Sequence, residues 1–198
     1  MTDAHQGGDR AHWETRYRER SAEPERSPSQ WVIERCLELP PTALIVDVAG
    51  GAGRHAGPLT ERGRTVVVID FIERAVERAV ARHPRVLGAV ADARALPLRP
   101  ESVDAIVCVS FLDRSLFTVF ANVLRPNGVL VYETFTRAHL DVVARGLARG
   151  PRNPAFLLEP NELPALVAPL RVAEHEENLV VDAAGERHVA RVMAVKQM

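Results

Sequence analysis

The sequence has little lysine, and it has no excess of either charge. Lys196 is the only lysine, which leaves 24 of the 25 basic residues as arginine. Because the whole chain favours arginine over lysine, no single arginine is by itself evidence of a phosphate-binding or carboxylate-binding residue. The formal net charge is -1, so the chain lacks the excess of positive charge that is typical of proteins that bind polyanions. We therefore expect no nucleic-acid partner.

Cysteine, metal-ligand spacings and long apolar runs are also scarce. Cys36 and Cys108 lie far apart, and Cys108 stands in an apolar run that is typical of a small buried residue. The histidines show no metal-ligand spacing, so we predict no metal site. No run is long enough to span a membrane, and residues 1–10 lack the apolar core of a signal peptide. We expect a cytoplasmic protein without a membrane partner, and the oligomeric state stays open.

What the sequence does contain is an alternation of apolar strands and amphipathic helices. Doubly apolar strands such as residues 65–70 are typical of parallel sheets covered on both faces. Residues 171–181 and 186–196 flank a turn and predict an antiparallel hairpin. The pattern indicates an α/β, Rossmann-like three-layer sandwich. The predicted strands lie within 43–48, 65–70, 86–92, 103–111 and 129–135, and the predicted helices within 31–39, 72–82 and 116–124.

Residues 1–30 are polar and rich in arginine and glutamate, and we interpret them as an N-terminal arm ahead of a main domain at 31–198. Trp13 and Tyr17 have the i,i+4 spacing of neighbours on one helix face. Two interpretations stay open for this helix: it folds over a ligand as a lid, or it packs as an ordinary N-terminal helix.

A small-residue turn, "VDVAGGAGRHA", follows the first strand. In open α/β sheets, ligands bind outside the carboxyl ends of the strands. Gly51 and Gly53 permit both unusual backbone angles and close approach of a ligand to the main chain. The alternative is a tight strand–helix connection without a ligand. The turn also fits the dinucleotide pattern G-x-G-x-x-G/A, which is weak on its own.

Three carboxylates end or follow the first three strands: Asp47, Asp70 and Asp92. A carboxylate repels a pyrophosphate but suits a cationic ligand, and S-adenosylmethionine carries a sulfonium and an ammonium. Asp70 suits ribose hydroxyls and Asp92 suits the adenine amine. Each has a structural alternative, since Asp70 could cap the following helix and Asp92 could be a loop acid. The acids favour S-adenosylmethionine as the cofactor.

Five segments in order, "VDVAGGAG", "VVVID", "ADARALPL", "VDAIVCVS" and "LRPNGVLVYETF", resemble the motifs of class I S-adenosylmethionine-dependent methyltransferases. The resemblance runs from about Trp31 to the end of the chain. It implies a mostly parallel seven-stranded sheet in the order 3-2-1-4-5-7-6, with an antiparallel C-terminal hairpin. Within that class, "GGAGRHA", "FLDRSLF", "YETFTR" and "PRNPAFLLEPNEL" are similar to the short tellurite-resistance-type methyltransferases.

The resemblance also implies a cofactor site. It places Arg54 near the cofactor carboxylate, Asp70 at the ribose, and Asp92 with Ala93 at the adenine. Three departures from the pattern are Ala49-Gly50 in the turn, Pro58 in the helix after it, and Asp113 where the branch has histidine. The implied cofactor-binding set is Asp47, Ala49, Gly50, Gly51, Gly53, Arg54, Asp70, Phe71, Asp92, Ala93, Val109, Ser110 and Phe111.

These features predict methyl transfer from S-adenosylmethionine to a small-molecule acceptor. A hydroxyl or amine acceptor needs a general base, for which Glu133 is the first candidate, whereas a thiolate or metalloid anion needs none. A structural hydrogen bond is the alternative role for Glu133. Rival functions are a non-catalytic nucleoside-binding protein and a nicotinamide-dependent oxidoreductase. Methylation of RNA or protein is disfavoured because the chain has no basic tract, and "SFLD" stands where amino-group methylases of bases have their signature.

Overall fold

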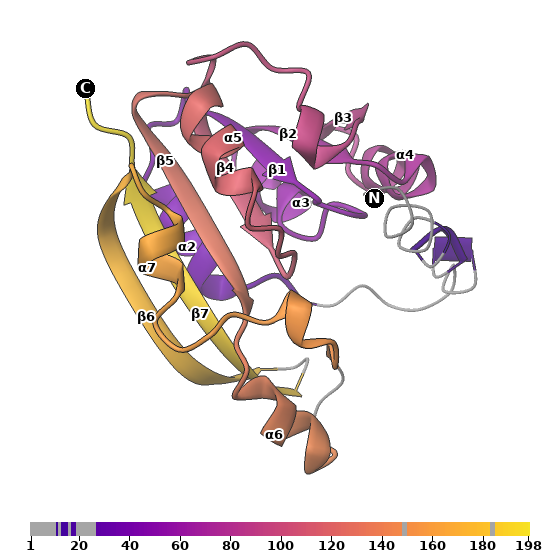
Figure 1. Ribbon diagram of the computed structural model, residues 1–198. Helices are drawn as coiled ribbons and strands as arrows, with labels where there is room; N and C mark the ends of the chain where they lie inside the picture. Colours follow the sequence, from indigo (N-terminus) through magenta and orange to yellow (C-terminus); the bar gives the residue numbers. More distant parts are fainter. Residues whose placement is uncertain (1–10, 12, 16, 19–26, 148–149, 183–184) are drawn as a thin grey trace.

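A seven-stranded sheet in the order β3-β2-β1-β4-β5-β7-β6 forms the centre of the computed structural model (Figure 1). The structure describes residues 11, 13–15, 17–18 and 27–198, apart from 148–149 and 183–184. Strands β1 to β5 run parallel, and β7 runs antiparallel to both β5 and β6. This confirms the predicted fold and strand order. The strands are β1 (Leu44–Val48), β2 (Thr65–Asp70), β3 (Leu87–Val90), β4 (Val103–Val109), β5 (Leu124–Phe135), β6 (Arg171–Asp182) and β7 (Gly185–Val195).

Helices cover both faces of the sheet and complete three layers. Helices α2, α3 and α4 lie on one face, and α5 and α7 lie on the other. No helix of the described residues is long and apolar enough to cross a membrane. The helices are α2 (Gln30–Leu37), α3 (Ala56–Glu61), α4 (Glu73–Arg82), α5 (Leu116–Val123), α6 (His139–Ala144) and α7 (Leu163–Leu166), with the short 3₁₀ helices η1 (Ala93–Ala95) and η2 (Pro154–Phe156).

Strands β1 and β4 lie at the centre of the sheet, which explains their uniformly apolar sequences. Side chains alternate between the faces of a strand, and both faces here are covered by helices. Ile45 and Val107 therefore pack under α2 and α3, while Val46 and Ile106 pack under α5. The edge strand β3 is different, since Leu87 is exposed. Buried β-branched side chains on both faces fix the register of the central strands.

Two details differ from the sequence-based expectations. Strand β5 begins at Leu124, before the predicted turn, and its pairing with β4 shifts register between Val103 and Ala105. Asn127 takes a left-handed backbone (φ 65°) inside this irregular stretch. Helical spacing places Val80 on one face of α4 with Ala75, Val76 and Ala79, but Val80 is 41% exposed because it lies over the edge strand. The interruption expected at Pro58 agrees with a six-residue α3.

Both cysteines are fully buried thiols, as the apolar context of Cys108 predicted. Burial, with a smaller effect from the charge of Asp47, raises the pKa of Cys36 to about 12. The same two causes raise the pKa of Cys108 well above its usual value. The thiolate is the reactive form, so neither cysteine is activated in the native fold.

We therefore expect iodoacetamide at pH 8 to label neither cysteine in the native protein and both in urea. Mass spectrometry of the intact chain after timed quenching measures the extent of labelling. Rapid native labelling at either position would contradict the burial described here.

Candidate functional site

The residues that follow the carboxyl ends of β1 and β4 have unusual backbone conformations of the kind found at functional sites. Ala49, directly after β1, and Ser110, directly after β4, are non-glycine residues with left-handed angles of φ 53° and 59°. These neighbouring strands lead to connections that diverge to opposite sides of the sheet, which is where open α/β folds bind ligands. Strained backbones of this kind cluster at functional sites. The predicted site therefore lies at the switch point of the sheet.

The glycines of the turn are required by the protein's own atoms. A Cβ at Gly50 would lie 2.7 Å from Cγ of Asp47, which is buried beneath the turn. Gly51 has a left-handed backbone (φ 59°), and a Cβ there would collide with the hydroxyl of Tyr17. A Cβ at Gly53 would lie 3.1 Å from Cβ of Ala79 on α4. Close packing of Asp47, Tyr17 and α4 thus explains the small residues at these three positions.

Asp70 ties the glycine turn to the start of α4. Its Oδ2 accepts a hydrogen bond from the Gly51 N–H at 2.9 Å, and its Oδ1 accepts one from the Ile72 N–H at 2.9 Å. Burial raises the pKa of Asp70, and the hydrogen bonds from the main chain oppose this rise. A carboxylate has further lone pairs, so the predicted contact with ribose stays a prediction.

The other residues of the expected cofactor set lie along the same edge of the sheet. Oδ1 of Asp92 accepts from the Arg94 N–H at 2.9 Å and caps η1, which contains the buried Ala93. Val90 is the register partner of Asp70, so the ends of β2 and β3 are adjacent. The Phe111 carbonyl accepts a hydrogen bond from the Tyr132 hydroxyl. Within this set Val109 ends β4 and is buried, Ser110 is exposed, and Phe71 and Phe111 are half-buried.

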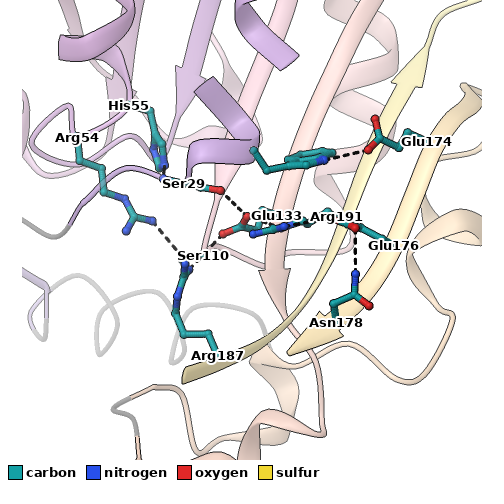
Figure 2. A network of polar contacts seen from close by, with 11 residues as sticks. Ser29, Arg54, His55, Ser110, Glu133, Glu174, Glu176, Asn178, Arg187 and Arg191 are labelled. Carbon is teal, nitrogen blue, oxygen red and sulfur yellow. Dashed lines mark hydrogen bonds and ion pairs between the residues drawn. The ribbon is translucent and has the colours of Figure 1, made fainter. Parts of the chain in front are cut away.

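Arg54 reaches from the glycine turn to the end of β4. Its Nη2 donates to the Ser110 Oγ at 3.3 Å (Figure 2). This contact joins the glycine turn to Ser110, one of the two residues with a left-handed backbone. The predicted role of Arg54 toward a cofactor carboxylate is not tested by it and stays a prediction.

The N-terminal arm contacts the glycine turn through Tyr17. The described residues among 11–18 are helical. Arg78 on α4 donates to the Tyr17 carbonyl oxygen, and its guanidinium lies 5.8 Å from the centre of the Tyr17 ring. Tyr17 is thereby held over Gly51. Much of the predicted arm, residues 1–10, 12, 16 and 19–26, lies outside the described residues, and the lid role stays a prediction.

Glu133, the candidate base, is fully buried at the centre of a polar group that we call the Glu133 cluster: Ser29, His55, Glu133, Arg187 and Arg191 (Figure 2). Its Oε2 accepts from the Ser29 Oγ at 2.6 Å and from the Arg191 Nε at 2.8 Å. Its Oε1 accepts from the Arg187 Nη1 at 3.2 Å. Both carboxylate oxygens thus accept hydrogen bonds from a guanidinium, and Oε2 accepts a further one from a hydroxyl.

His55 connects this cluster to the glycine turn. Its Nε2 accepts a hydrogen bond from the Ser29 N–H at 3.1 Å, which places the ring proton on Nδ1. Burial lowers the pKa of His55 well below its usual value, and the charges of Arg54 and Arg187 lower it further. The ring is therefore neutral at physiological pH, and its basic nitrogen is already used by the start of α2.

Sequence reasoning did not identify Ser29, His55, Arg187 or Arg191. A signal for the two arginines existed: in "ERHVARVMAV" they alternate with apolar residues on a strand expected next to β5. Side chains at i and i+4 of a strand share a face, so both arginines had to point into one buried layer. Ser29 and His55 gave no such signal. Each is a polar residue that is buried only because distant elements of the chain pack against it.

Residues 45–128 match the family model described as "Methyltransferase domain". This match covers β1 to the start of β5 and includes the glycine turn and all three acids. The matched segment, which is less than half of the chain, is thus similar to a methyltransferase domain. The sheet order in which it lies is that of the class I, Rossmann-like methyltransferase fold, and S-adenosylmethionine is the methyl donor that the family implies.

Solved structures and curated relatives extend the comparison. A SAM-dependent methyltransferase of Methanosarcina mazei has a TM-score of 0.72 at 18% identity, covering 87% of this chain and all of that one. A Micromonospora griseorubida protein named for 23S rRNA (guanine-N1) methylation is 38% identical over 49% of this chain. A malonyl-[acyl-carrier protein] O-methyltransferase of Methylococcus capsulatus is 35% identical over 51%. The matches span only 33% and 40% of these two relatives.

The residues of the matched segment fit the cofactor that the similarity implies. Asp47 and Asp70 place two buried carboxylates at the ends of β1 and β2, where a cationic ligand is stabilised. The glycine turn between them presents bare main chain. No group of histidine, cysteine and carboxylate side chains among the described residues is arranged to hold a metal ion. Asp113, one of the three departures from the resembled pattern, accepts a hydrogen bond from Arg94 Nε at 2.6 Å.

Proposed function

We propose that this protein is an S-adenosylmethionine-dependent methyltransferase that acts on a small-molecule acceptor. The observation that supports this most is the family match of residues 45–128 within a sheet of the class I order. The strained backbones at Ala49 and Ser110 mark the same edge of the sheet. The activity follows from neither alone, since a protein of this fold can bind the nucleoside without catalysing transfer.

The chemistry needs little from the protein beyond alignment. The bound cofactor supplies an electrophilic methyl group on a positively charged sulfur. The residues at the switch point hold both reactants in line, and effective molarities in well-oriented systems reach on the order of 10⁵ M or more. Asp47 and Asp70 favour the cationic ligand, and Asp92 with Ala93 would border the adenine. The Tyr17 hydroxyl lies over Gly51 at this edge of the sheet.

We propose that Glu133 is a positioning residue, although our sequence analysis named it as the candidate base. Its carboxylate joins α2, β5 and β7 through Ser29, Arg187 and Arg191. A proton on Glu133 would disrupt these charge-assisted hydrogen bonds. This role agrees with a soft or already ionised acceptor, such as the thiol or metalloid acceptors suggested by the resemblance to tellurite-resistance-type enzymes.

Ribosomal RNA is the second candidate acceptor, because one relative is named for 23S rRNA guanine methylation. The net charge of -1 and the absence of a basic tract favour a small molecule instead. The name of the other relative, an O-methyltransferase of a malonyl group, supports an acceptor that is not a nucleic acid.

Isothermal titration calorimetry tests the cofactor first. We expect S-adenosylmethionine and S-adenosylhomocysteine to bind at least about tenfold more tightly than NADH, a difference of about 1.4 kcal/mol or more. Tight NADH binding without either sulfur nucleoside would refute the proposal. A tritium-transfer screen with thiols, metalloid oxyanions, phenols, carboxylic acids and 23S rRNA fragments then identifies the acceptor. Binding without transfer to any of them would favour a non-catalytic nucleoside-binding protein.

A further inference from the structure

An ion pair between Arg94 and Asp113 joins two loops that leave the sheet at strands that are not neighbours. Nε of Arg94 lies 2.6 Å from Oδ2 of Asp113. Arg94 is in η1, which follows β3, and Asp113 follows β4. Strands β2 and β1 lie between β3 and β4, and neighbouring strands are about 4.8 Å apart, so the two loops begin about 14 Å from each other. The pair therefore connects the loops on either side of the strand ends at which we propose the cofactor to bind.

Asp113 is fixed in place by its own loop and by the start of α5. Its Oδ1 accepts hydrogen bonds from the Ser115 N–H at 3.0 Å and from the Ser115 hydroxyl at 2.7 Å. Its carbonyl oxygen accepts a third from the Leu116 N–H at 3.1 Å, and Leu116 is buried in the core. The Asp113 side chain is 17% exposed. The carboxylate is therefore an anchor of defined position, and its second oxygen holds Arg94.

The helix η1 needs contacts outside itself to hold its orientation. It has three residues, and a 3₁₀ helix of this length has little stability of its own. One such contact is the burial of Ala93 in the core cluster that also contains Ile69 of β2. A second comes from Arg94, whose main-chain N–H donates to Oδ1 of Asp92 at 2.9 Å while its side chain reaches Asp113. The direction of the Asp92 carboxylate therefore depends on where Arg94 is held.

We infer that Arg94 is a positioning residue and that it sets the preference of the cofactor site for adenine. This inference rests on the proposed function, in which Asp92 borders the adenine of the cofactor. The Arg94 N–H holds one oxygen of the Asp92 carboxylate, whose remaining lone pairs can accept from the exocyclic amine of the base. Arg94 thus acts on the base through Asp92.

A fixed acceptor discriminates between bases better than a mobile one. Hypoxanthine carries a carbonyl oxygen where adenine carries the amine, so a carboxylate held at that position would face a second acceptor and lack a donor. If Asp113 did not hold η1, the Asp92 carboxylate could turn away from the wrong base and the preference would fall. The Arg94–Asp113 pair therefore contributes specificity by preorganising the site. A partly exposed ion pair contributes little to the stability of the fold.

Calorimetry of the full chain with S-adenosylhomocysteine and S-inosylhomocysteine measures this preference, because in the second ligand a carbonyl oxygen replaces the amine of the base. We expect the natural protein to bind the adenosine form about tenfold or more tightly. Arg94→Gln, which removes the ion pair, should reduce this ratio of affinities by about threefold or more. Arg94→Lys keeps a cation within reach of Asp113 and should retain most of the ratio. A variant with a structural defect alone would lose affinity for both ligands in equal proportion.

Arg125→Gln is the matched control. Arg125 pairs with Asp104 at 2.8 Å, and its side chain is 50% exposed, against 48% for Arg94. Asp104, like Asp113, also accepts a hydrogen bond from a main-chain N–H, in this case that of Leu44. This pair lies at the opposite end of the parallel strands, where β4 and β5 begin. We expect the control variant to keep the natural preference, and thermal unfolding should show similarly small losses of stability in both glutamine variants.

An unchanged ratio of affinities in Arg94→Gln, an equal loss for both ligands, or the same change of ratio in Arg125→Gln would overturn the inference. So would a natural protein that binds both ligands equally well, a result that would leave the proposed function standing. If the natural protein bound neither ligand, the proposed function would be refuted, and the role of Arg94 toward adenine would fall with it.

Discussion

Replacing Glu133 by glutamine is expected to lower the free energy of unfolding by about 3–5 kcal/mol. The substitution keeps the shape of the side chain but removes the charge that Arg187 and Arg191 share at 3.2 and 2.8 Å. Water cannot compensate, because Glu133 is fully buried and both arginines are nearly so. A domain has about 5–15 kcal/mol of stability in total, so the loss would be large. Urea denaturation followed by tryptophan fluorescence measures it.

The matched control is Glu159→Gln, which removes an ion pair with Arg137 of similar length, 2.8 Å, between half-exposed side chains. Exposed pairs contribute about 0–1 kcal/mol. The free energy of unfolding of this variant should therefore lie within about 1 kcal/mol of that of the natural protein. A Glu133→Gln protein that is equally stable but has lost methyl transfer would contradict the positioning role. It would restore Glu133 as the general base.

Replacing Gly51 by alanine is expected to weaken S-adenosylhomocysteine binding by about tenfold to a hundredfold. The left-handed backbone at φ 59° costs a residue with a Cβ about 1–2 kcal/mol. The added Cβ also collides with the hydroxyl of Tyr17, so the turn or the arm must shift. Each 1.4 kcal/mol lost from binding is a factor of about ten in affinity. Calorimetry measures the affinity. Thermal unfolding of the same variant shows whether a lower affinity comes from a weaker site or from loss of the folded structure.

Gly63→Ala is the control for backbone strain alone. Gly63 has a comparable angle, φ 82°, with no atom within 4 Å of the added Cβ, and it follows α3 away from the switch point. We expect this variant to lose stability but to bind the nucleoside normally. The double variant Tyr17→Ala, Gly51→Ala should regain part of the affinity if the collision matters. Normal binding by Gly51→Ala would show that the turn does not approach the cofactor.

The strands of the sheet were predictable because each can be recognised from the residue types in its own short segment. Strands such as β1 and β2 are apolar on both faces, and the two strands of the predicted hairpin are found at Arg171–Asp182 and Gly185–Val195. Val80 is exposed although it shares a helical face with Val76, because helical periodicity gives the face of a helix but not how far the sheet extends beneath it. The early start of β5 was missed because turn residues inside a strand look like its boundary.

The site was predictable only in part. The acids Asp47, Asp70 and Asp92 were located because strand ends converge at one edge of a parallel sheet. The partners of Asp70, the N–H groups of Gly51 and Ile72, could not be read from the sequence. The reason for a glycine at position 50 could not be read from the sequence either. A side chain there would collide with Asp47, so the protein's own packing, and not a ligand, requires the glycine. The roles of these residues toward the cofactor stay predictions.

By itself the sequence determined the α/β class, the glycine turn and the acids at the strand ends, because each depends on residue type and short spacing; the strand order came from the resemblance to a known family. Tertiary structure alone decided that Glu133 lies between two arginines and that the buried His139 accepts a hydrogen bond from the His188 N–H. Those contacts join residues 49 to 104 positions apart. Charge and hydrogen-bonding act over a few ångströms of space, and the folding of β7 against β5 sets which distant residues come within that range.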